Sequence, residues 1–223
     1  MSANSAPRFA LPGTWGRVNL ASDATAQKSI RRLVEHAVGR EDNRATLRAE
    51  LRGRFREATA LAMANDAVDF YLALELAPGV PLPAWLAVFL PDIGSMDLDA
   101  LGLSELRAGL QYGVKGTAPE GASTATLTLN RVQAVRQAFR RVQAATDETP
   151  QLDLLQVDYW IAASEPNRIA LLTFTTSYVD IEAQMLEFFD AVLGTVSWHS
   201  PYEAGSDERA VDESALVVDT LPE

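Results

Sequence analysis

Val157–Ser177, with the sequence VDYWIAASEPNRIALLTFTTS, is the stretch that decides the fold class of this chain. Two apolar runs flank Pro166 and Asn167, which favour a tight connection because proline pre-sets a turn dihedral and asparagine tolerates unusual backbone angles. The second run, Ile169–Thr176, begins apolar on both alternating faces, which is typical of a central strand covered on both sides. The stretch therefore predicts a β-hairpin at the centre of a layered α/β fold.

Periodicity along the rest of the chain predicts the elements that surround this hairpin. Alternating apolar residues indicate strands, and apolar residues three and four apart indicate amphipathic helices. The segment 124–145 fits both patterns, and its local periodicity favours a helix after Asn130. The other expected elements are a strand over 15–20, helices over 25–38 and 44–64, strands over 67–77 and 86–90, and a helix over 97–112.

The last helix is the clearest element of the sequence. Asp180 is its expected N-cap, because a carboxylate at that position accepts hydrogen bonds from free backbone N–H groups of the first turn. Glu187 and Asp190 are expected on its outer face. Its apolar stripe consists of Ile181, Met185, Phe188, Phe189, Val192 and Val196.

The composition is that of one globular domain followed by an acidic tail. The chain has 223 residues, 48% of them hydrophobic, and a net charge of −11. We expect residues 1–200 to form a single α/β domain and residues 201–223 an acidic C-terminal tail. The negative charge disfavours nucleic acid as a partner. Without a signal peptide or a long apolar run, the expected protein is cytoplasmic and makes no membrane contact.

The residue inventory argues against several chemistries. Zero cysteines exclude disulfides and thiolate catalysis, and the chain has only two histidines, His36 and His199. The sequence contains neither a phosphate-binding glycine loop nor a G-x-S-x-G motif. We therefore expect no cofactor, no metal and no enzymatic activity. The enzyme hypothesis that remains is a site assembled from scattered residues, namely Arg136, Asp158, Tyr159 and His36.

A basic stripe is the first predicted surface for a protein partner. Residues 28–57 contain nine Lys and Arg against five Asp and Glu, within an otherwise acidic chain. Arg44, Arg48 and Arg52 recur four residues apart on one side of the expected helix, and arginine forks pair well with carboxylates. The stripe suits an acidic partner or the chain's own acidic tail, and it also fits a merely solvated face.

The tail contains a second candidate surface. Leu216, Val217 and Val218 form an apolar segment outside the expected core, and such a segment can add to a partner as an edge strand or short helix. An exposed edge of the sheet makes a homodimer a further expectation.

An alternative function is the transport of a small apolar ligand between the last helix and the sheet. Trp160, Phe174 and Phe188 are the expected lining of such a pocket, which would also need a few convergent polar groups. The competing interpretation is that these aromatic side chains simply fill the core.

Three segments carry a resemblance to a known family: LPGTW (11–15), DYWIAAS with LLTFTTS (158–164 and 171–177) and MLEFFDAVLGTVSW (185–198). Together with the element order they resemble the PsbP-like superfamily, and more closely uncharacterised actinobacterial proteins, some of them associated with type VII secretion. The resemblance implies a three-layer α/β/α sandwich with a mainly antiparallel central sheet, and a strand over about 132–142. It implies no catalytic residues, and it favours a non-enzymatic protein-interaction or accessory domain.

Overall fold

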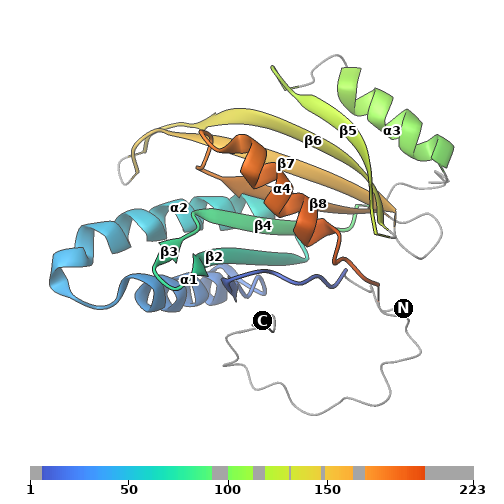
Figure 1. Cartoon of the computed structure of the whole chain (residues 1–223). Coiled ribbons are helices and arrows are strands. Elements are labelled where there is room, and N and C mark those ends of the chain that lie inside the picture. Colours follow the sequence, from blue (N-terminus) through green and yellow to red (C-terminus); the bar gives the residue numbers. More distant parts are fainter. Residues whose placement is uncertain are drawn as a thin grey trace, which may run out of the picture.

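The structure is a computed structural model that describes residues 7–91, 100–112, 119–130, 132–146, 149–162 and 169–198. Within these residues the chain forms a mixed α/β fold with an eight-stranded sheet (Figure 1). The elements are, in chain order, β1 (Thr14–Arg17), α1 (Asp23–Val38), η1 (Asp42–Arg44), α2 (Ala45–Ala64), β2 (Asp69–Ala77), β3 (Val80–Pro81), β4 (Ala84–Phe89), α3 (Ala100–Tyr112), β5 (Ser123–Leu129), β6 (Val132–Gln143), β7 (Leu152–Ala162), β8 (Ile169–Thr176) and α4 (Glu182–Leu193).

The sheet has the strand order β1-β2-β4-β8-β7-β6-β5, with β3 paired to β2, and all of these pairings are antiparallel. The predicted hairpin is confirmed as β7 and β8, with Val157 opposite Phe174. The central position of β8 is also confirmed, because it pairs with β4 on its other edge. Phe174 and Thr175 are both buried although they point to opposite faces, as expected for a strand covered on both sides.

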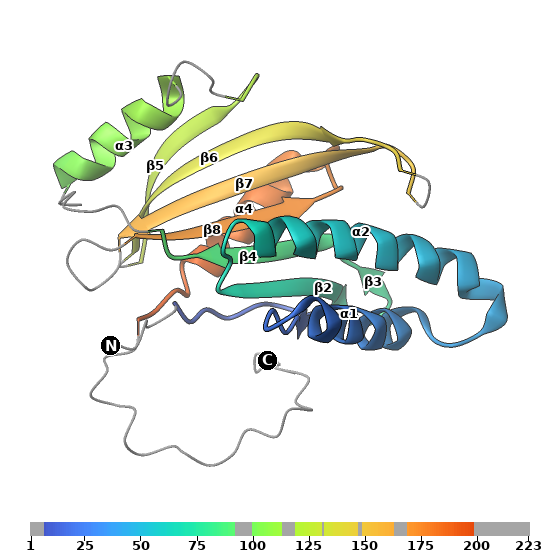
Figure 2. The same ribbon diagram turned by 180° about the vertical axis from the view of Figure 1, so that it is seen from behind.

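Helices lie on both faces of the sheet (Figures 1 and 2). Helix α4 packs on one face, where Phe189 stacks on Phe174 with ring centroids 4.5 Å apart. Helices α1 and α2 cover the opposite face over β2, β4 and β7. Helix α3 lies beside β5 and β6, where the side chain of Gln137 donates a hydrogen bond to the Leu110 carbonyl at 3.0 Å. No helix of the described residues is long and apolar enough to cross a membrane.

Residues 132–143 form strand β6. This confirms the strand over about 132–142 that the resemblance implies, and the helix that local periodicity favours after Asn130 is wrong. Strand β6 pairs with β5 on one edge and β7 on the other. Asn130, with φ of 55°, makes the turn between β5 and β6. Hydrogen bonding along both edges stabilises the strand more than local propensity stabilises a helix, so tertiary pairing decides its conformation.

Two expectations for the last helix are wrong. Its N-cap is Ile181 and not Asp180, and no side chain makes the capping hydrogen bond. Asp190 does not lie on the outer face, because it turns toward the sheet and pairs with residues of β6 and β7. Residues 97–99 of the expected third helix and the acidic tail lie outside the described residues.

Candidate functional site

The candidate site lies where α1 turns into α2. Helix α1 ends at Gly39, whose φ of 81° falls in the left-handed region that glycine adopts without strain. The two helices share an apolar contact zone that includes Ile30, Val34 and Phe55. This packing holds the end of α1 against the first turns of α2. The connected ends of the helices extend past the strands (Figures 1 and 2).

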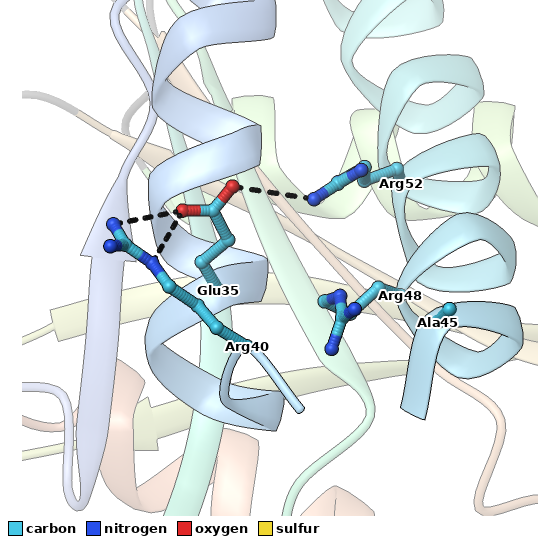
Figure 3. Close-up of a pocket in the computed structure, with 5 residues that line it drawn as sticks. All are labelled: Glu35, Arg40, Ala45, Arg48 and Arg52. Atoms are coloured by element: carbon cyan, nitrogen blue, oxygen red, sulfur yellow. Dashed lines mark hydrogen bonds and ion pairs between the residues drawn. The ribbon is translucent and has the colours of Figure 1, made fainter. Parts of the chain in front are cut away.

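An open pocket of about 310 Å³ lies between these helix ends. Figure 3 shows the guanidinium groups of Arg40 and Arg52 on opposite sides of the Glu35 carboxylate, with Arg48 projecting from α2. The complete lining is Glu35, Arg40, Ala45, Arg48 and Arg52. Three permanent positive charges and one carboxylate thus line the pocket, and the local charge is positive.

The ion pairs inside the pocket are weak because their atoms lie more than 3 Å apart and the Arg40 side chain is largely exposed. Arg40 donates to Glu35 from Nε at 3.3 Å, and Arg52 donates to the same carboxylate from Nη2 at 3.4 Å. The Arg40 side chain is 85% exposed, compared with 29% for Arg52 and 25% for Glu35. Exposed pairs of this length contribute at most about 1 kcal/mol each. An incoming anion can therefore compete with Glu35 for these guanidinium groups.

Two residues of the predicted stripe have a structural role at the end of α1. Arg44 donates to the Val38 carbonyl at 3.0 Å, and Arg48 donates from Nη1 to the carbonyls of Gly39 and Glu41 at 3.0 and 2.7 Å. The last carbonyls of a helix have no partner within the helix and carry partial negative charge, so cations there are stabilising. Each guanidinium has five donors, and these contacts use only Nη1 of Arg48.

The structure thus brings together two of the three predicted stripe residues, Arg48 and Arg52, and adds Arg40 and Glu35. Arg44 turns away to Val38 and Glu41. The sequence carried no signal for the added pair, because Arg40 lies beyond the end of α1 and five residues from Glu35. Side chains three or four apart meet on a helix surface, whereas this contact depends on the turn.

The arginines of this site offer the chemistry of anion binding. Arginine stays charged at all ordinary pH values and offers a planar fork that matches carboxylates and phosphates. The Arg52 Nε atom is buried and has no hydrogen-bond partner, so a donor of this guanidinium is unused. Among the lining residues, Glu35 is held as the counter-ion of Arg40 and Arg52. The arrangement suits a ligand with more than one negative charge.

The structure does not bring together the three aromatic residues of the alternative ligand pocket. Phe174 is fully buried against Phe189, and Phe188 lies at the edge of the same cluster. Trp160 faces the opposite side of the sheet, because its neighbour Tyr159 points to α4 and successive side chains of a strand alternate. Core packing accounts for Phe174, and the sheet itself separates it from Trp160.

The structure brings together two residues of the enzyme hypothesis, Arg136 and Tyr159, and separates them from Asp158 and His36. Tyr159 donates to Asp190 at 2.6 Å and Arg136 pairs with the other carboxylate oxygen at 2.5 Å, on the α4 face. Burial and the Asp190 carboxylate raise the pKa of Tyr159, which keeps its hydroxyl protonated. Asp158 lies on the opposite face, and His36 is exposed on α1. Sequence reasoning missed Asp190 because it was expected on the outer face of the last helix, outside the apolar stripe.

Asp158 is a buried carboxylate on the α1–α2 face of the sheet. It accepts hydrogen bonds from the Gln156 amide at 3.1 and 3.2 Å. Burial raises its pKa, while Thr173, Gln156 and the charge of Arg141 act in the opposite direction. The carboxylate is thus held by short-range contacts within β7 and β8.

The residues of the predicted tail surface, Leu216, Val217 and Val218, lie outside the described residues, as does His199. Their part in binding stays a prediction.

Comparisons with known proteins leave the family of this chain open. No family model matches it, and no curated protein matches it. Solved structures that match include a protein of Bacteroides thetaiotaomicron VPI-5482, with 10% sequence identity over 60% of this chain and a TM-score of 0.38. This chain spans 40% of that protein's length.

Proposed function

We propose that this protein is a non-enzymatic interaction domain that holds an acidic segment of a protein partner in the pocket between α1 and α2. The observation that supports it is the pocket itself, which three arginines and a single carboxylate line at the exposed end of a helical hairpin. Bidentate pairing between arginine and carboxylate gives such a site both affinity and orientation.

The charge distribution supports the same proposal. Residues 28–57 have a local excess of four positive charges in a chain whose net charge is −11. A positive region on a negative molecule attracts an acidic partner at one place and repels it elsewhere, which steers the encounter and fixes the orientation. Arg40 and Arg48 project from this region into the pocket.

The proposal includes the finer architecture and the cellular setting. The helices on both faces of the antiparallel sheet support a three-layer α/β/α sandwich as the scaffold that presents the hairpin. A cytoplasmic location, a PsbP-like ancestry and a link to type VII secretion are further parts of the proposal, which the sequence and its resemblance motivate. The apolar tail segment around Val217 would give the partner a second contact.

The experiment is affinity capture from a lysate of the native host with three full-length proteins. The pocket variant is Arg40→Gln with Arg52→Gln, which removes two positive charges and keeps Arg48 as the cap of α1. The control is Arg8→Gln with Arg107→Gln, which removes the same charge from exposed positions on other elements. Thermal unfolding checks that all three are folded.

We expect the wild type and the control to retain a protein partner. The pocket variant should retain at least tenfold less of the same partner. The capture should also weaken as salt rises, because exposed charges are screened. Equal capture of the same proteins by the pocket variant and the wild type would contradict the proposal.

A further inference from the structure

We propose that the group which the pocket between α1 and α2 accepts is the phosphate monoester of a phosphorylated side chain on the partner. This inference rests on the proposed function, because it assumes that the pocket binds an acidic segment of a protein. It adds the chemical class of the group that enters the pocket. It also implies that phosphorylation of the partner controls the interaction.

The charge of the pocket matches a group with two negative charges. The lining contains three arginines, Arg40, Arg48 and Arg52, and one carboxylate, that of Glu35, which leaves an excess of two positive charges. A phosphorylated side chain carries about two negative charges at neutral pH. An Asp or Glu side chain carries one negative charge and neutralises half of the excess. A phosphate monoester therefore neutralises the pocket with a single group.

The geometry of a peptide favours one doubly charged group over two carboxylates. The pocket has a volume of about 310 Å³. Adjacent side chains of an extended segment point to opposite sides, so only one carboxylate of an adjacent acidic pair can enter. Side chains two residues apart point the same way but lie about 7 Å from each other. A phosphate monoester brings both charges to one point in the pocket.

Three guanidinium groups approach the pocket from different directions. Arg40 comes from the end of α1, while Arg48 and Arg52 project from α2 (Figure 3). The contacts of Arg40 and Arg52 with Glu35 are long, at 3.3 and 3.4 Å, and the backbone carbonyls engage only Nη1 of Arg48. A phosphate monoester has three terminal oxygens that accept hydrogen bonds, compared with two in a carboxylate. One phosphate can therefore accept from all three arginines.

The start of α2 adds to the positive potential. Ala45 lines the pocket and is the first residue of this 20-residue helix. The side chain of the N-cap residue, Arg44, makes no capping hydrogen bond. The N-terminal end of a helix carries a partial positive charge that favours a phosphate. Arg44 and Arg48 donate to carbonyls at the end of α1 and offset the partial negative charge there.

The first test compares labelled peptides by fluorescence anisotropy, with the full-length protein at low salt. The probe is a short fluorescein-labelled peptide of glycine and serine whose central serine is phosphorylated. A second peptide has a similar net charge on two aspartates one residue apart, and a third has neither modification nor acid. We expect the phosphopeptide to bind about tenfold more tightly than the aspartate peptide, and the uncharged peptide not to bind.

Two variants show whether the phosphopeptide uses the pocket. Arg40→Gln with Arg52→Gln should weaken its binding by about tenfold, because two of the three guanidinium groups are gone. Arg8→Gln with Arg107→Gln removes the same charge from exposed positions on other elements, and its affinity should stay within about twofold of the wild type. Thermal unfolding checks that both variants are folded.

The pH dependence identifies the second charge of the phosphate. Lowering the pH from about 7.5 to about 5 protonates the phosphate, whose second pKa is about 6, while aspartate stays ionised and arginine stays charged. The preference for the phosphopeptide over the aspartate peptide should therefore shrink. Groups of the protein that titrate near the pocket act on both peptides and cancel in the ratio of the two affinities. These groups are Glu35, His36, Glu41 and Asp42.

The second test distinguishes a phosphorylated partner from free phosphate. The wild type is used for affinity capture from two dialysed lysates of the native host, one treated with a phosphatase and one mock-treated. We expect capture of the partner to fall about tenfold after phosphatase treatment, because the doubly charged group is removed. Equal capture from the two lysates would mean that the partner needs no phosphate, even if free inorganic phosphate binds the pocket.

The outcomes separate the inference from the proposed function. If the phosphopeptide and the aspartate peptide bind equally and through the pocket arginines, or phosphatase leaves the capture unchanged, the inference is wrong and the proposed function stands. Equal binding of the phosphopeptide to the pocket variant, or a preference that does not change with pH, also overturns the inference. If no peptide binds, the inference is wrong, and the proposed function fails with it when the pocket variant captures the same proteins as the wild type.

Discussion

The α4 face and the α1–α2 pocket both contain arginine–carboxylate pairs, but these pairs differ in distance and in exposure. Arg136 and Asp190 lie 2.5 Å apart with side chains 18% and 21% exposed, and Tyr159 donates to the same carboxylate. Arg40 and Glu35 lie 3.2 Å apart, and the Arg40 side chain is 85% exposed. The charged groups of the pair on the α4 face are satisfied within the protein. The charged groups of the pair in the pocket remain accessible to a ligand.

The difference teaches how to separate a structural ion pair from a binding one. On the α4 face, the carboxylate has two donors and the surrounding residues are apolar, so a ligand would gain nothing by competing. In the pocket, Arg40 and Arg52 share one carboxylate, and Arg48 lines the same pocket with only its Nη1 engaged by backbone carbonyls. An excess of donors over acceptors, together with exposure, indicates binding.

The largest effect should come from breaking the α4 face at its apolar centre. Phe174→Ala removes a fully buried ring that stacks on Phe189 and contacts Tyr159 edge-on. We expect the free energy of unfolding to fall by about 3–5 kcal/mol. Urea denaturation measures it. Ile181→Ala, at a 44% exposed residue beside the same helix, is the control, and we expect it to cost less than about 1 kcal/mol.

A smaller effect should come from breaking the structural ion pair. Arg136→Gln leaves Asp190 with Tyr159 alone in a half-buried setting, and we expect a loss of about 2 kcal/mol of unfolding free energy. Arg140→Gln on the same strand removes the Glu182 pair, which is 60% and 35% exposed, and it should cost under about 1 kcal/mol. Equal losses in the two variants would show that exposure does not distinguish these pairs.

The smallest effect on stability should come from the pocket. Arg40→Gln removes an 85% exposed side chain, and we expect the unfolding free energy to change by less than about 0.5 kcal/mol. The same variant should retain less of the captured acidic partner than the wild type, because it removes one positive charge from the pocket. A loss of stability as large as that of Arg136→Gln would mean that the pocket is a structural element, and the comparison would fail.

Much of the fold was predictable because burial leaves a pattern in the sequence. The apolar run of Ile169–Thr176 indicated a central strand, and the apolar spacing over 25–38 indicated a helix; the structure bears out both. Strand β6 was predictable only through the resemblance, since its local spacing favours a helix. Asp180 failed as a cap because the chain enters α4 one residue later, at Ile181.

The site was predictable only in part. Arg48 and Arg52 stood out by their spacing on one helix, whereas Arg40 and Glu35 join them only through the turn between α1 and α2. The aromatic hypothesis grouped Trp160 with Phe174 by residue type. The sheet separates them, because neighbouring side chains of a strand point to opposite faces.

By itself, the sequence determined the central hairpin, the amphipathic helices and the concentration of positive charge over residues 28–57, because these depend on the order of residues along the chain. Only the tertiary structure decided that Asp190 faces Arg136 and Tyr159, and that Arg40 and Arg52 meet at Glu35. Contacts between distant residues depend on how helices and strands pack, and that packing follows from the free energy of the whole domain rather than from any local pattern.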